Sequence, residues 1–125
     1  MRRFIYVLMA VIIFGIASCS KSMTQYDNEI SLAEMIMRNN TDSALSLLDE
    51  IDPSELEIDS LRAKYHYLKG WGHLSGNRSM VGDSLIGYAH NFYRGKDIVR
   101  NIRSGIVFAW YKFWVGDTPG ALTML

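Results

Sequence analysis

Apolar side chains recur at helical intervals from Asn28 to the end of the chain, and this periodicity constrains the fold more than any other feature. Such spacing is typical of helices that bury one face and expose the other. Short polar or glycine-containing segments interrupt the pattern at residues 39–40, 75–79 and 94–95 and at Gly116. No segment requires a β-strand, so the sequence predicts an all-α fold.

Capping residues and prolines set the expected boundaries of the first three helices. The first helix begins at Asn28 and ends before the asparagine pair at 39–40. Thr41 and Asp42 can cap the second, and Pro53 ends it because the residue before a proline avoids the helical conformation. The start of the third helix is left open between three capping residues: Ser54, Asp59 and Ser60.

Three further helices are expected after residue 80. Asp83 and Ser84 cap the fourth. The fifth carries the longest apolar stripe, which is expected to face the core: Ile98, Ile102, Ile106, Ala109 and Phe113. Thr118 as the cap and Pro119 at the first helical position begin the sixth. Short connections make neighbouring helices antiparallel, so the six form hairpins.

The hairpins have features of degenerate repeats. Asp42 and Ser43 open a second helix, as Asp83 and Ser84 do 83 − 42 = 41 residues later, and Asp117 follows after 117 − 83 = 34. In the last hairpin, Ala109 and Ala121 are 12 residues apart. Two small residues at this spacing resemble the helix crossing of a tetratricopeptide repeat, which leaves room for only a methyl group.

The N-terminus has the order of a secretory signal. Arg2 and Arg3 precede an apolar run over residues 4–17, and small residues follow, ending at Cys19. The run has 14 residues, whereas a membrane-spanning helix needs roughly 20. Export and cleavage after residue 18 are therefore favoured over a permanent span. The alternative is that Cys19 is an ordinary thiol at the end of an uncleaved anchor.

The segment Ile16-Ala17-Ser18-Cys19 resembles a bacterial lipoprotein signal. That resemblance implies that Cys19 becomes the first mature residue, with a diacylglyceryl group on its sulfur and an acyl chain on its amine. Two or more chains anchor a protein stably. The expected organisation is a signal peptide (1–18), a lipidated tether (19–27) and a helical repeat domain (28–125). Because the last helix is short and apolar, we expect this domain to be incomplete at its C-terminus.

This signal, together with residues 42–53 and 82–86, resembles tetratricopeptide-repeat lipoproteins of Bacteroides-type bacteria. The resemblance implies stacked antiparallel helical hairpins in an envelope protein that binds other proteins. Because no acidic cluster follows Cys19, the anchored protein is expected to face the periplasm. In longer relatives the repeats precede a membrane segment and a cytoplasmic DNA-binding tail, neither of which is present here.

Charge is distributed unevenly along the chain. The full sequence has 13 basic and 13 acidic residues. Residues 20–60 contain 2 basic and 10 acidic residues, whereas residues 61–125 contain 9 basic and 3 acidic residues. The mature chain, with 11 basic and 13 acidic residues, has a net charge of 11 − 13 = −2. This net charge does not favour nucleic acid as a partner. The basic group is expected to support the fold first and to contact anionic headgroups second: Arg94, Lys96, Arg100 and Arg103.

Residues that could carry chemistry do not form a site. Seven helical residues separate His66 from His73 by about 10.5 Å of rise, too far for both to bind one metal ion. His90 adds no pattern, and Ser84 beside Asp83 fits a helix cap better than a nucleophile. The sequence therefore predicts no catalytic residue, no metal, no cofactor and no enzyme activity.

Aromatic residues near the C-terminus are the candidate partner site. Trp110, Tyr111 and Trp114 flank the apolar stripe of the fifth helix. Most aromatic side chains should fill the core, but these three are candidates for a groove where a partner binds.

The leading hypothesis is a lipid-anchored, non-catalytic scaffold for a protein or peptide partner. The alternative is the periplasmic sensor portion of a membrane-bound tetratricopeptide-repeat transcription regulator, truncated before its other parts. A third class, an envelope enzyme, would need polar side chains converging in a cleft.

Overall fold

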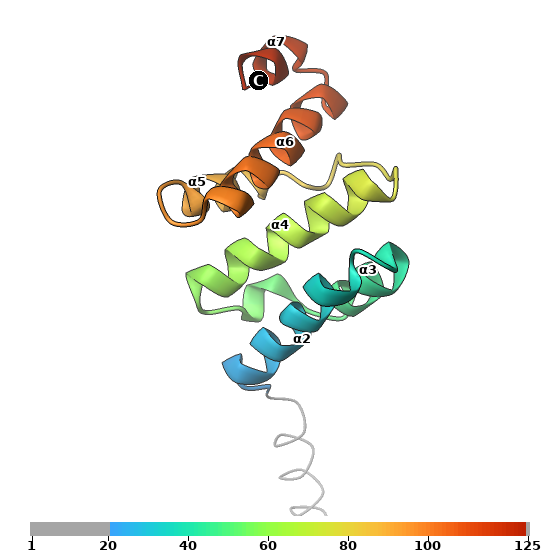
Figure 1. The fold of residues 1–125 in the computed structure, drawn as a ribbon, viewed down its shortest axis with the longest axis vertical. Helices are drawn as coiled ribbons and strands as arrows, with labels where there is room; N and C mark the ends of the chain where they lie inside the picture. The colour runs from blue at the N-terminus through green and yellow to red at the C-terminus, as the bar shows by residue number, and fades with distance from the viewer. Residues whose placement is uncertain (1–20, 125) are drawn as a thin grey trace, which may run out of the picture.

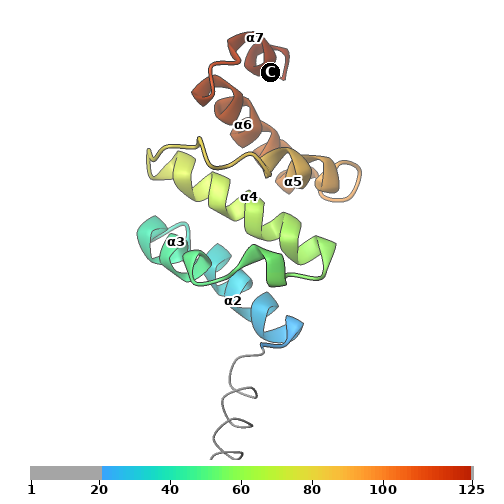
Figure 2. The same cartoon turned by 180° about the vertical axis from the view of Figure 1, so that it is seen from behind.

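The computed structural model describes residues 21–124, and this part of the chain is all-α, which confirms the predicted fold class. Its elements are α2 (Met23–Ile36), α3 (Thr41–Asp49), the one-turn 3-10 helix η1 (Pro53–Glu55), α4 (Asp59–Ser75), α5 (Ile86–Tyr93), α6 (Ile98–Trp114) and α7 (Thr118–Thr123). They follow one another along the long axis, from α2 and α3 at one end to α6 and α7 at the other (Figures 1 and 2). None of the helices in residues 21–124 is long and apolar enough to cross a membrane.

The long helix α4 organises the packing. It contacts α2 and α3 on one side and α5 and α6 on the other, while α7 packs on α6. Tyr67 and Leu68, near its middle, are 2% and 1% exposed. At Gly70, an added Cβ would lie 2.7 Å from Val107 Cγ1, so the absence of a side chain lets α6 approach α4 closely. The core is therefore continuous across α4.

Helix α2 begins earlier than the periodicity predicts. The Ser22 hydroxyl accepts a hydrogen bond from the Gln25 amide at 3.2 Å, and the Gln25 side-chain oxygen accepts one from the Ser22 amide at 3.0 Å. This capping box places residues 23–27 of the expected tether in the helix. Tyr26, only 4% exposed, packs in the core one turn before Ile30. The four-residue spacing of Tyr26 and Ile30 is hard to recognise in the sequence, because the residues beside Tyr26, such as Gln25, are polar.

Several predicted caps differ from those in the structure. Asn40 and Asp117 cap α3 and α7, each one residue earlier than predicted. Helix α4 begins at Asp59, one of the three open alternatives, but its N-cap is Ile58 and no side chain caps it. Helix α5 begins only at Ile86 without a side-chain cap, because the Asp83 carboxylate is turned inward to the His73 ring, 2.8 Å away. Tertiary hydrogen bonding thus replaces the predicted cap.

The predicted core stripe of α6 is mostly exposed. Ala109 is buried, but the exposed fractions of the other four range from 40% to 79%: Ile98, Ile102, Ile106 and Phe113. Helix α6 instead turns Ser104 and Val107 toward its neighbours. This helix has apolar residues on two faces, and glycines on α4 and α5 accept the face that carries Val107 and Phe108. The opposite apolar face is therefore left on the surface of residues 21–124.

Candidate functional site

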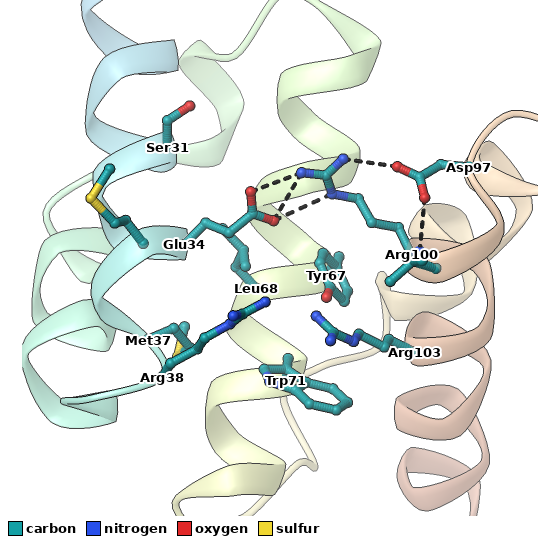
Figure 3. A pocket seen from close by; sticks show the side chains of 12 residues that line it. Ser31, Glu34, Met37, Arg38, Tyr67, Leu68, Trp71, Asp97, Arg100 and Arg103 are labelled. Atoms are coloured by element: carbon teal, nitrogen blue, oxygen red, sulfur yellow. Dashed lines mark hydrogen bonds and ion pairs between the residues drawn. The ribbon is translucent and has the colours of Figure 1, made fainter.

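A groove of about 590 Å³ crosses three helices on one side of the stack. Its walls are α2 with the turn after it, α4 and α6. Each wall contributes two of the residues that define its chemistry: Glu34 and Arg38, Tyr67 and Trp71, Arg100 and Arg103 (Figure 3). The groove exists because α2 and α6 both pack against α4.

An ion-pair network spans one end of this groove. Arg100 Nη2 lies 2.8 and 3.0 Å from the two carboxylate oxygens of Glu34, and Arg100 Nε lies 3.3 Å from one of them. Arg100 Nη1 donates to Asp97 at 2.8 Å. Lys64 reaches the same Glu34 carboxylate at 3.5 Å and donates to the Ser31 hydroxyl at 3.1 Å. The donors of Arg100 are thus directed to acidic groups of the protein itself.

The network also fixes the start of α6. The Asp97 carboxylate caps the helix by accepting a hydrogen bond from the Arg100 backbone amide at 3.0 Å. That hydrogen bond, with the Arg100 side chain, lowers the pKa of Asp97. Hydrogen bonding to Glu34 raises the pKa of Arg100 above its ordinary value. Both groups are therefore charged at neutral pH. Their hydrogen bonds hold the Arg100 side chain between Asp97 and Glu34.

The other end of the groove is cationic and aromatic. The Arg103 guanidinium lies over the Trp71 ring, 5.4 Å from its centroid. In Figure 3 the Arg38 and Arg103 side chains reach toward one another from opposite walls. Neither makes an ion pair with an acidic side chain of residues 21–124. This end can accept an anionic or hydrogen-bond-accepting group.

The aromatic residues predicted as a partner site lie elsewhere. Trp110 and Trp114 are 47% and 44% exposed, and Trp110 packs edge-to-face on Phe113 with ring centroids 5.8 Å apart. Tyr111 is partly buried and stacks on Phe108. None of the three predicted residues lines the groove. They form part of a separate aromatic surface at the end of α6.

The other predicted site residues have different settings. Ala109 and Ala121 are 5% and 7% exposed, and they lie on the two helices that pack at the C-terminal end of the stack. Cys19 lies outside the residues that the structure describes.

The three histidines have separate environments. His73 binds Asp83, and His90 Nδ1 lies 3.1 Å from the Asn101 carbonyl oxygen and 3.2 Å from the Ser104 hydroxyl. His66 packs edge-on against the Tyr65 ring. Within residues 21–124 no cluster of three or more histidine, cysteine or acidic side chains could hold a metal ion.

The residues of the groove lie far apart in the sequence, and no motif links them. Arg100 and Arg103 are three residues apart and so share a helix face, which was the one available signal. Glu34 is 66 residues from Arg100, and nothing in the local sequence links the two. Comparison of the chain with protein-family models, curated proteins and solved structures found no match.

Proposed function

We propose that this protein is a lipid-anchored, non-catalytic scaffold that binds a peptide segment of another envelope protein in the groove between α2, α4 and α6. The observation that carries the proposal is the groove itself, an open channel with ordered ion pairs at one end and two cationic side chains at the other. Extended grooves across stacked helices are common peptide-binding surfaces.

The arrangement of helices supports degenerate tetratricopeptide-like repeats as the finer architecture. Helices α2 and α3, α4 and α5, and α6 and α7 are sequential pairs in contact, and each pair packs on the next. Ala109 and Ala121 supply the small buried side chains that a close crossing of α6 and α7 needs. In this architecture the first helix of each pair lines one face, which is where the groove lies.

The anchor would hold the groove close to a membrane. Only residues 20–22 separate Cys19 from the start of α2 at Met23. A lipid on Cys19 would therefore leave little slack between bilayer and domain. We infer a position in the cell envelope, facing the periplasm.

The anchor is tested by metabolic labelling with a fatty-acid analogue and by cell fractionation. We expect the wild-type chain to be labelled and to sediment with membranes, and Cys19→Ser to be unlabelled and released or mislocalised. Unlabelled wild-type protein in the membrane fraction would contradict lipidation.

The partner is tested by quantitative co-purification from envelope extract. We expect Trp71→Ala to lose a discrete set of proteins that wild type retains, because this indole forms a wall of the groove. Trp114→Ala is the matched control, since this indole lies outside the groove. Loss with Trp114→Ala alone would instead favour the aromatic surface on α6. Circular dichroism of both variants checks that they are folded.

A further inference from the structure

Two arginines converge in the groove without a counter-ion. Arg38 and Arg103 point toward each other in the groove (Figure 3), and neither pairs with an acidic side chain of residues 21–124. The groove lining holds three arginines against Glu34 and Asp97, both of which bind Arg100. The excess positive charge is therefore concentrated at the Arg38 and Arg103 end, where like charges repel until an anion lies between them.

A third donor points to the same place. The Tyr67 side chain is 2% exposed, yet its hydroxyl makes no hydrogen bond within the part of the chain that the structure describes. In that part of the chain, every side-chain nitrogen or oxygen that is fully buried has a hydrogen-bond partner. Because the Tyr67 hydroxyl has none, its oxygen atom must be slightly accessible to solvent. Figure 3 shows its oxygen on the groove side, facing the two guanidinium groups. Buried tyrosines usually find a partner for this hydroxyl.

We propose that Arg38, Arg103 and Tyr67 form a carboxylate site that recognises an acidic side chain of the docked peptide. The two guanidinium groups bind the carboxylate oxygens from opposite sides, and the Tyr67 hydroxyl donates a third hydrogen bond. Trp71 packs against the aliphatic part of the same residue. Arg100 takes no part, because Glu34 and Asp97 already occupy its donors.

The choice of a peptide carboxylate follows from the rest of the lining. Met35 and Val99, both exposed, supply apolar contacts beside the cations, as a peptide chain would require. The inference rests on the proposed scaffold function and specifies the chemistry of its partner: an acidic segment.

The test is a nuclear magnetic resonance titration of the full chain in nonionic detergent, observing the Trp71 indole N–H. The probes are N-acetyl-tetraglutamate amide, the matching tetraglutamine peptide and inorganic phosphate. We expect a saturable shift with tetraglutamate alone. Arg38→Gln and Arg103→Gln should each weaken its affinity by about tenfold or more, and Tyr67→Phe by less.

Arg94→Gln is the control, because it removes the same charge from an exposed residue outside the groove. The Arg94→Gln variant should bind tetraglutamate with the affinity of wild type. If Arg94→Gln lost as much affinity as the groove variants, net charge alone would be responsible and the proposed site would be wrong. Equal shifts with tetraglutamine, or stronger binding of phosphate, would overturn carboxylate recognition. No shift with any probe would also overturn it, while Trp71-dependent co-purification would still support the scaffold.

Discussion

The guanidinium group of Arg100 on α6 binds both carboxylate oxygens of Glu34 on α2, 66 positions earlier in the chain. Each of these helices packs on α4. The pair therefore joins α2 directly to α6 and forms one end of the groove. The two side chains are 31% and 32% exposed, so water partly screens the interaction.

A double-mutant cycle measures what this pair contributes. Glu34→Gln, Arg100→Gln and the double variant should reveal a coupling free energy of about 1 kcal/mol by urea unfolding, the upper part of the range for partly exposed pairs. The more exposed pair of Asp42 and Arg78 is the control, and its coupling should be close to zero. Equal coupling in both cycles would mean that the groove pair has no special role in the fold.

Gly70→Ala tests the close approach of α4 and α6. Its new Cβ would lie 2.7 Å from Val107 Cγ1 and 3.3 Å from Ile86 Cδ1. Overpacking typically costs about 1 to 3 kcal/mol, whereas alanine gains about 1 kcal/mol in helix propensity. We expect the steric cost to be larger, so that Gly70→Ala unfolds at a lower temperature than wild type. Gly82→Ala, where no atom lies within 4 Å of the added Cβ, should show no such steric loss. A more stable Gly70→Ala variant would refute the contact.

Ala109→Trp and Ala121→Trp test the crossing of α6 and α7. Both alanines are buried on helices that pack against each other, so either indole should separate the two helices. We expect a loss of about 1 to 3 kcal/mol in the free energy of unfolding, out of a total that is often near 5 in small domains. Thermal melting measured by circular dichroism is the readout, and unchanged melting of both variants would exclude a close crossing.

His66 should make stability depend on pH. Burial, with a smaller contribution from Arg62, lowers the pKa of His66 below its ordinary value of 6.5. The folded state therefore favours the neutral ring, and stability falls once the pH drops below about 6.5, where the unfolded chain takes up the proton first. His66→Gln should flatten this decline in urea midpoints between about pH 7 and 5. Parallel curves for wild type and variant would contradict it.

Local signals explain why much of the fold is predictable. Gly116, with φ of 87°, follows the end of α6 in the left-handed region that glycine favours, whereas α3 already ends at Asp49, before the position that Pro53 restricts. Such effects act within a few residues, so they are visible in the sequence. The cap of α5 is not predictable in this way, because Asp83 binds His73 on another helix. The start of α2 does have a local signal, the Ser22 and Gln25 capping box, which a prediction from apolar spacing alone leaves out.

The groove depends on contacts that periodicity cannot supply. Helix α6 has two apolar faces, and the close approaches at Gly70 and Gly87 favour burial of the face with Val107 rather than the face with Ile102. That rotation places Arg100 and Arg103 in the groove. The same two arginines had been predicted to support the fold, which Arg100 does through Glu34.

Photocrosslinking at the groove in living cells tests the central claim of a partner-binding groove most directly. A photoreactive amino acid replaces Met35, which lines the groove and is 72% exposed, or Ser46 on α3, an exposed control outside the groove. We expect a discrete adduct from position 35 that is absent from position 46 and is lost when Arg103→Gln is added. No adduct at position 35, or an adduct indifferent to Arg103→Gln and equally strong at position 46, would contradict docking in this groove.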